Sequence, residues 1–301
     1  MHPEKISLVC FFASYVLALV LELTRLLRSM SLNRWAGWLA AAAGFVAQTT
    51  YLIVRSRAAE LPPLLSSTHD WLLVLAWLTV LVHLLVALVH RQIAVGVFTL
   101  PIVVLLVGAS RFVSSEPNPI EEAHRWWSMA HATFLVLGIA GVIFGAALSV
   151  MYLVQHARLK RPQSEVGGLR MFSLERIARL NWWSVIVSVP LLTLGMATGA
   201  LLTWLSRTSP QPISLWRWSF FVSGAAWLVL VALFGWLLTT RRATGRLVAW
   251  RTLLAGAFVL ATLLTLGILS GGMHGAAKPA DDVRLPAEPA PFVRTVAVLH
   301  P

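Results

Sequence analysis

The 301-residue chain is unusually apolar: 58% of its residues are hydrophobic, only 12% are charged, and the mean hydropathy is +0.77. Soluble domains carry about twice that fraction of charged residues, so the composition predicts an integral membrane protein and excludes an ordinary soluble domain. The formal net charge of +12 would suit nucleic acid, but the basic residues sit in short segments between apolar runs, as topology-setting loops do. We therefore expect a lipid bilayer, and no nucleic acid, around this chain.

The first apolar run, from Ile6 to Leu27, is too long for the core of a signal peptide. No clear small-residue cleavage site follows it, so we interpret it as a retained helix. The single cysteine, Cys10, lies in this run. One cysteine excludes an internal disulfide and a metal site built from several cysteines.

Eight apolar segments are long enough, or nearly so, to cross a hydrocarbon core of roughly 30 Å as helices. The fourth is the least clearly bounded, because Pro101 interrupts it and only Arg91 separates it from the third. A proline is tolerated where neighbouring groups satisfy the freed carbonyl. The predicted fold class is an all-α integral membrane protein, a bundle of about eight transmembrane helices with short loops, at approximately 6–27, 35–54, 71–89, 92–109, 130–154, 182–204, 218–238 and 250–270.

Lysine and arginine predict the orientation of this bundle. They are concentrated after the first, third, fifth and seventh segments, most densely at 158–179 and 241–251. These loops should be cytoplasmic, so both termini should be external to a bacterial cytoplasmic (inner) membrane. The Ala- and Pro-rich tail with balanced charge is expected to be disordered.

Two histidines lie at the external ends of predicted spanning segments. His131 begins the fifth spanning segment, and His274 follows the eighth in SGGMHGA. Two neutral imidazoles on one face can supply both axial positions of a haem iron. The glycines around His274 would let a planar ligand approach the backbone closely. The alternative is that each is an ordinary interfacial histidine.

Tryptophans and glycines accompany the two histidines. Indole rings would line the same external interface, although indoles collect at membrane interfaces regardless of function. The glycines of the fifth segment, Gly138, Gly141 and Gly145, would equally serve close helix packing. The tryptophans concerned are Trp126, Trp127, Trp204, Trp216 and Trp218.

Further polar residues fall within or beside spanning segments. His83 lies deep in the third segment, where a polar group is costly and usually faces a partner or a cavity. It could be a transient ligand or a hydrogen-bonded packing residue. Gln48 and Glu22 are expected to be buried, with Glu22 pairing near the surface with Arg25, one turn away. Two external histidines, His69 and His124, could be functional or merely exposed.

Four segments resemble, in order, segments of the cytochrome c assembly protein family. These are multi-span haem-handling proteins of cytochrome c maturation, with relatives encoded beside early haem-synthesis enzymes. The segments are LLSSTHDWLLVLAWLTVLVH at 64–83, with Asp70 where an acid is common, WSMAHATFLVLGIAGVIFGAALSVMYLV at 127–154, PLLTLGMATGA at 190–200 and GMHGA at 272–276. The resemblance divides the chain into two N-terminal helices at 1–59, a haem-handling membrane domain at 60–277 and an external tail at 278–301.

The resemblance implies that His131 and His274 are the axial ligands of a non-covalently held, b-type haem, whether stable or transient. Trp127, Trp216, Trp218 and His83 are further candidate haem contacts. Two departures from the family pattern concern haem attachment. SLWRWSFF at 214–221 stands where ligating members have WGxxWxWDxxE, and GWLLTTRR at 235–242 lacks a histidine near the end of its helix.

Three functions remain open at this stage. The favoured one is a haem-binding membrane protein of cytochrome c assembly, which handles or delivers haem at the outer face, alone or with a partner subunit. The second is a membrane regulator of glutamyl-tRNA reductase, contacted through the basic segment 155–181. The third is a small-solute carrier that uses a cavity at His83, although no inverted repeat of broken helices stands out. The sequence has no independent catalytic motif, so it assigns no catalytic residue.

Overall fold

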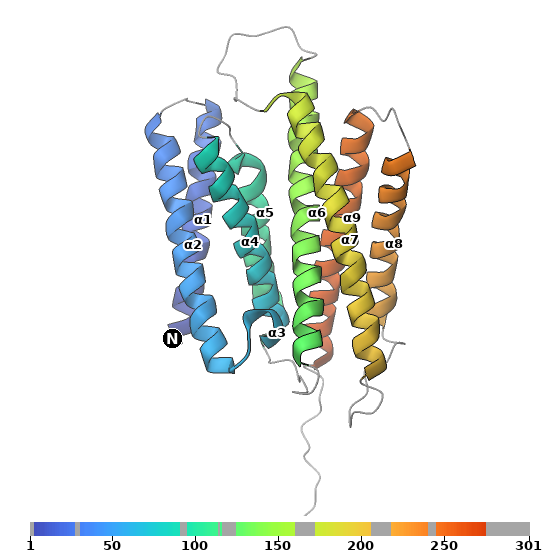
Figure 1. Cartoon of the computed structure of the whole chain (residues 1–301). Helices are drawn as coiled ribbons and strands as arrows, with labels where there is room; N and C mark the ends of the chain where they lie inside the picture. Colours follow the sequence, from blue (N-terminus) through green and yellow to red (C-terminus); the bar gives the residue numbers. More distant parts are fainter. Residues whose placement is uncertain are drawn as a thin grey trace, which may run out of the picture.

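The chain was analysed as a computed structural model that describes residues 3–27, 31–90, 95–113, 115, 125–159, 172–205, 218–239 and 245–274. Within these ranges all regular structure is helical (Figure 1). The helices are α1 (Pro3–Leu27), α2 (Ser31–Ala59), α3 (Pro63–Ser66), α4 (Thr68–Val89), α5 (Gly96–Ala109), η1 (Ser110–Phe112), α6 (Arg125–Leu159), α7 (Leu174–Leu205), α8 (Trp218–Thr239) and α9 (Gly245–His274).

The predicted all-helical fold is confirmed over the described residues, and each predicted segment overlaps one helix. Pro101 lies inside α5, which continues through it. Among the described residues, four helices are long and apolar enough to cross a membrane, and two apolar helices are shorter, at Leu8–Thr24 and Gly96–Phe112. A full set of eight crossings stays a prediction. The four candidate spans are Trp35–Ala59, Thr68–Val89, Arg125–Leu159 and Leu174–Leu205.

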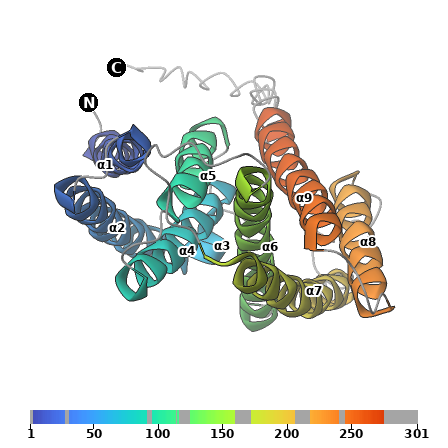
Figure 2. The ribbon, with the colours of Figure 1, turned by 90° about the horizontal axis from the view of Figure 1, so that it is seen from above.

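α6 is the central helix of the bundle. Seen from above, it lies between α4 and α5 on one side and α7 and α9 on the other, and it packs against all four (Figure 2). Its 35 residues extend about 52 Å at 1.5 Å per residue, well beyond a hydrocarbon core of roughly 30 Å. α6 is therefore long enough to extend beyond the hydrocarbon core. α6 begins at Arg125, five residues before the predicted start of the fifth segment at residue 130.

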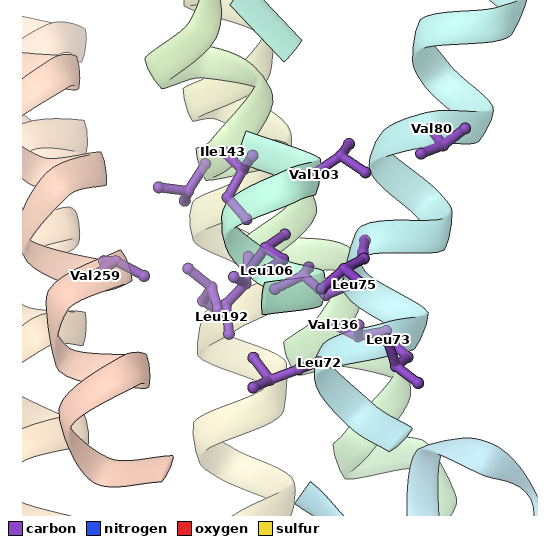
Figure 3. Close-up of a cluster of buried hydrophobic side chains, with 14 of the residues drawn as sticks. Leu72, Leu73, Leu75, Val80, Val103, Leu106, Val136, Ile143, Leu192 and Val259 are labelled. Carbon is purple, nitrogen blue, oxygen red and sulfur yellow. The ribbon is translucent and has the colours of Figure 1, made fainter. Parts of the chain in front are cut away.

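Aliphatic side chains from four helices fill the space around α6 (Figure 3). Leu72 and Leu75 of α4, Leu106 of α5 and Ile143 of α6 are at most 2% exposed. Figure 3 shows Leu192 of α7 among them. This cluster joins the N-terminal and C-terminal helices in one continuous core.

Glycines bring α6 and α7 into close contact. A Cβ atom on Gly138 would lie 2.7 Å from Cγ of Leu192, and one on Gly195 would lie 2.6 Å from Cδ2 of Leu135. Any side chain at these positions would separate the helices. The packing role considered for Gly138, Gly141 and Gly145 is therefore confirmed.

The helix directions alternate as predicted. The start of α6 and the end of α9 lie at the same end of the bundle, the lower end in Figure 1. The distribution of lysine and arginine predicts that this end lies outside the cell, which stays a prediction. The expected disordered tail, the basic residues 160–171 and His124 lie outside the described residues.

Candidate ligand pocket at His131

The imidazole of His131 is fixed by the backbone of α7. His131 is the seventh residue of α6, and its Nδ1 lies 2.7 Å from the carbonyl oxygen of Gly195. Because a carbonyl can only accept, Nδ1 carries the proton and donates it. In the neutral ring Nε2 then holds a free lone pair. The side chain of Thr198 lies 3.5 Å from Nδ1 and itself donates to the carbonyls of Leu194 and Gly195.

A glycine in α7 makes room for this ring. A Cβ atom on Gly199 would lie 2.7 Å from Cε1 of His131 and 3.1 Å from Nδ1. Two glycines one turn apart in α7 therefore contribute to the position of His131. Gly195 supplies the acceptor carbonyl, and Gly199 supplies the space for the ring.

This arrangement fits an axial metal ligand. Histidines that bind metals nearly always donate their second ring N–H to a carbonyl, a carboxylate or water, which fixes the tautomer and the ring plane. His131 has this partner in Gly195. The described residues hold no group of three or more metal-ligating side chains, whereas a haem needs only one or two axial ligands from the protein.

His131 lines an open pocket of about 280 Å³. Ligand pockets typically enclose about 300–1,000 Å³, so a porphyrin would extend beyond this one toward the end of the bundle. Its walls are mainly apolar, with three hydroxyl groups. The lining residues are Leu64, Leu65, Ser67, Thr68, Trp71, Ser128, His131, Ala132, Leu135 and Leu202.

The other predicted haem contacts lie apart from this pocket or outside the described side chains. Trp127 projects from α6 and is 42% exposed, and the neighbouring Trp126 is 80% exposed. Both exposures are typical of tryptophans that lie at a membrane interface without contacting a ligand. Trp216 lies outside the described residues, and the side chains of Trp218 and His274, at the ends of α8 and α9, also lie outside them.

His83 belongs to a different cluster, between α1, α4 and α5. It is 2% exposed, and its Nδ1 lies 3.1 Å from the hydroxyl of Thr99. Cε1 of His83 and the carboxyl carbon of Glu22 lie 2.9 and 3.0 Å from the position that a Cβ would take on Gly96. The imidazole and the carboxyl group are therefore close neighbours. Glu22 is buried as predicted, and the side chain of its expected partner Arg25 lies outside the described set.

The position of His83 separates it from His131. Trp71, which lines the His131 pocket, precedes His83 by twelve residues of α4, or about 18 Å along the helix axis. The structure thus does not bring these two candidate ligands together. The surroundings of His83 favour a hydrogen-bonded packing residue over a transient ligand.

Filling the space at Gly96 should destabilise this cluster without affecting His131. A Gly96→Ala methyl group would meet both Glu22 and His83 within 3.0 Å. We expect a loss of about 1–3 kcal/mol of stability, the usual cost of overpacking, with any haem spectrum unchanged. Thermal unfolding in detergent measures the loss. Gly235→Ala is the matched control, since its added Cβ has open space around it. Equal unfolding temperatures for the two variants would contradict the prediction.

His69 is buried, so the alternative that it is merely exposed is wrong. It is 6% exposed, and its Nδ1 donates to the carbonyl of Ser110 at 2.7 Å. Its Nε2 lies 3.4 Å from the hydroxyl of Tyr51. These contacts connect the start of α4 with η1 and α2.

Sequence reasoning missed the corner between α3 and α4, which forms half of the pocket wall. Trp71 is its largest lining residue. The available signal was its position directly after Asp70, in the segment that resembles the assembly family. The four-residue helix α3 gave no hydropathy signal of its own.

Comparison with known proteins gives distant relatives. Similar curated proteins include two named "Cytochrome c biogenesis protein CcsA" from Prochlorococcus marinus strains MIT 9515 and MIT 9301, 26% and 24% identical over 199 residues. Each alignment covers 57% of this chain and 64% of the relative. A protein of the same name from Gloeobacter violaceus is 28% identical over 103 residues, 33% of this chain and 30% of the relative.

The chain thus spans less than two thirds of the length of these relatives. No family model matches the chain, and no solved structure matches it. The chain is a helical membrane protein with distant sequence similarity to proteins named for cytochrome c biogenesis.

Proposed function

We propose that this protein acts in cytochrome c biogenesis by binding haem at the outer end of its helix bundle. The observation that carries the proposal is the fixed tautomer of His131. Its Nδ1 donates to the carbonyl of Gly195, which leaves Nε2 as a metal ligand beside an apolar pocket. The distant similarity to CcsA proteins supports the same function.

In this proposal the protein holds a b-type haem without a covalent bond. His131 provides one axial ligand, and His274, the last residue of α9, provides the second from the same end of the bundle. The haem would supply the iron and a flat apolar surface. The chain's own groups fix the imidazole, through Gly195, and keep water from one side of the ligand, through Leu64, Leu135 and Leu202.

The proposal assigns haem handling to residues 60–277, with α1 and α2 as a supporting pair packed on α5 and α4. Ser219 stands where the aspartate of the ligating family motif would be, and Thr239 and Thr240 stand where a histidine would be. These departures favour holding or delivering haem over attaching it. An assembly partner would then supply the attachment step, at the outer face of the bacterial inner membrane.

Deletion of the gene in its host tests the biological part of the proposal. We expect loss of covalently bound haem from c-type cytochromes, measured by haem staining after denaturing electrophoresis, with normal amounts of glutamyl-tRNA reductase. Restoration by the wild-type gene, and not by a His131→Ala gene, would connect the phenotype with the pocket. Normal cytochromes together with altered reductase levels would reject assembly in favour of the regulatory alternative.

A further inference from the structure

The wall of the pocket facing His131 comes from the segment 64–83, for which the family resemblance implies no haem contact other than His83. Five of its ten lining residues belong to the corner between α3 and α4: Leu64, Leu65, Ser67, Thr68 and Trp71. Apart from the imidazole of His131, the indole of Trp71 is the one aromatic ring among the ten. An indole ring offers a large, rigid, flat surface, which suits a flat apolar ligand.

Consecutive residues just before Trp71 are anchored to other elements. Ser67 is the N-cap of α4 and accepts a hydrogen bond from the amide of Asp70 at 3.1 Å. His69 donates to the carbonyl of Ser110. Asp70, only 1% exposed, contacts Nε of Arg55 at 2.7 Å and accepts a short hydrogen bond from Ser66. The backbone that carries Trp71 is therefore held from α2, α3 and η1.

A buried ion pair is a poor way to stabilise a fold, because desolvation of both charges offsets most of their attraction. Apolar residues of similar size would often serve as well. What the Arg55–Asp70 pair provides is geometry: a buried ion pair, with Nε of Arg55 2.7 Å from Oδ1 of Asp70, that holds one turn of α4 beside α2. The residue that follows this turn faces the pocket.

We propose that Trp71 is a contact residue for the ligand bound at His131, and that Asp70, paired with Arg55, positions it. The inference rests on the proposed function, since it names the second wall of the same site. It assigns the ligand class as a flat, mainly apolar tetrapyrrole, which lies with one face toward the indole ring of α4.

The test measures ferric haem binding by the full-length protein in detergent. Trp71→Leu, which keeps apolar volume and removes the flat ring, should weaken binding roughly tenfold at an unchanged Soret maximum, because the iron keeps its axial ligands. The matched control is Trp77→Leu on the same helix. Trp77 donates to Thr49 at 2.8 Å and stacks on Phe45, so its loss should lower the unfolding temperature and leave haem affinity unchanged.

Two variants separate positioning from stability. Asp70→Asn should weaken haem binding and speed haem transfer to apomyoglobin, again with an unchanged Soret maximum. The double variant Arg55→Met with Asp70→Met removes both buried charges. We expect it to recover the unfolding temperature lost in Asp70→Asn but not the haem affinity. Recovery of both would show that the pair is merely structural.

The outcomes distinguish this inference from the proposed function. If wild-type protein binds haem and Trp71→Leu binds it equally well, the inference is overturned and the proposed function stands. If Trp71→Leu does not fold, Trp71→Met, which also lacks a flat ring, replaces it with the same criterion. Wild-type protein that takes up no ferric haem would overturn both.

Discussion

Replacing His131 with alanine should weaken haem binding at least roughly 100-fold. The variant removes the ligand itself, and changes to the partners of a metal ligand alone typically cost 10–100-fold. The double variant His131→Ala with His274→Ala should show no Soret band after haem addition. Absorbance titration of purified protein measures both effects. External imidazole should restore part of the band in His131→Ala, because the alanine leaves the space beside Gly199 open to an imidazole ring.

A histidine at the other end of α6 provides the control. His156 stacks on Tyr152 with its ring centroid 6.1 Å away, far along the helix from the pocket. His156→Ala should keep the wild-type haem affinity and the wild-type spectrum. A double variant at His131 and His274 that retains the wild-type band would place the haem elsewhere and reject these ligands.

The helices could be predicted from the sequence because hydropathy depends on residues that are adjacent in the chain. Strict alternation of direction then places the start of α6 and the end of α9 at one end of the bundle. No contact had to be known for this inference. The two candidate axial ligands were therefore assigned to the same end of the bundle from the sequence alone.

The pocket itself could not be predicted, because its geometry depends on contacts between distant residues. The hydrogen bond of His131 goes to a carbonyl 64 residues away. The burial of His69 depends on the carbonyl of Ser110, 41 residues away. Likewise, Glu22 meets His83 only because Gly96 lets α1, α4 and α5 converge. Periodicity identifies which face of a helix is apolar, but not which polar groups meet across it.

Adding one methyl group at Gly199 should weaken haem binding almost as much as direct loss of the hydrogen bond that orients His131. The new Cβ in Gly199→Ala would lie 2.7 Å from Cε1 of His131, so the imidazole must move and its hydrogen bond to Gly195 must lengthen or break. Loss of such an orienting hydrogen bond typically costs 10–100-fold in metal affinity. Haem titration should show this loss together with a shifted or broadened Soret band.

Gly224→Ala in α8 is the matched control for this substitution. The same methyl group is added there, but apart from the local helix backbone no described atom lies within 4 Å of the new Cβ. Helix propensity alone favours alanine over glycine by about 1 kcal/mol, so Gly224→Ala should keep its haem affinity and unfold no earlier than wild type. If Gly199→Ala also binds haem normally, the orientation of His131 by α7 is unimportant for ligation. His131 would then not need its hydrogen bond to the Gly195 carbonyl to bind iron. Because that hydrogen bond is the structural basis for assigning His131 as a ligand, the assignment would lose its support.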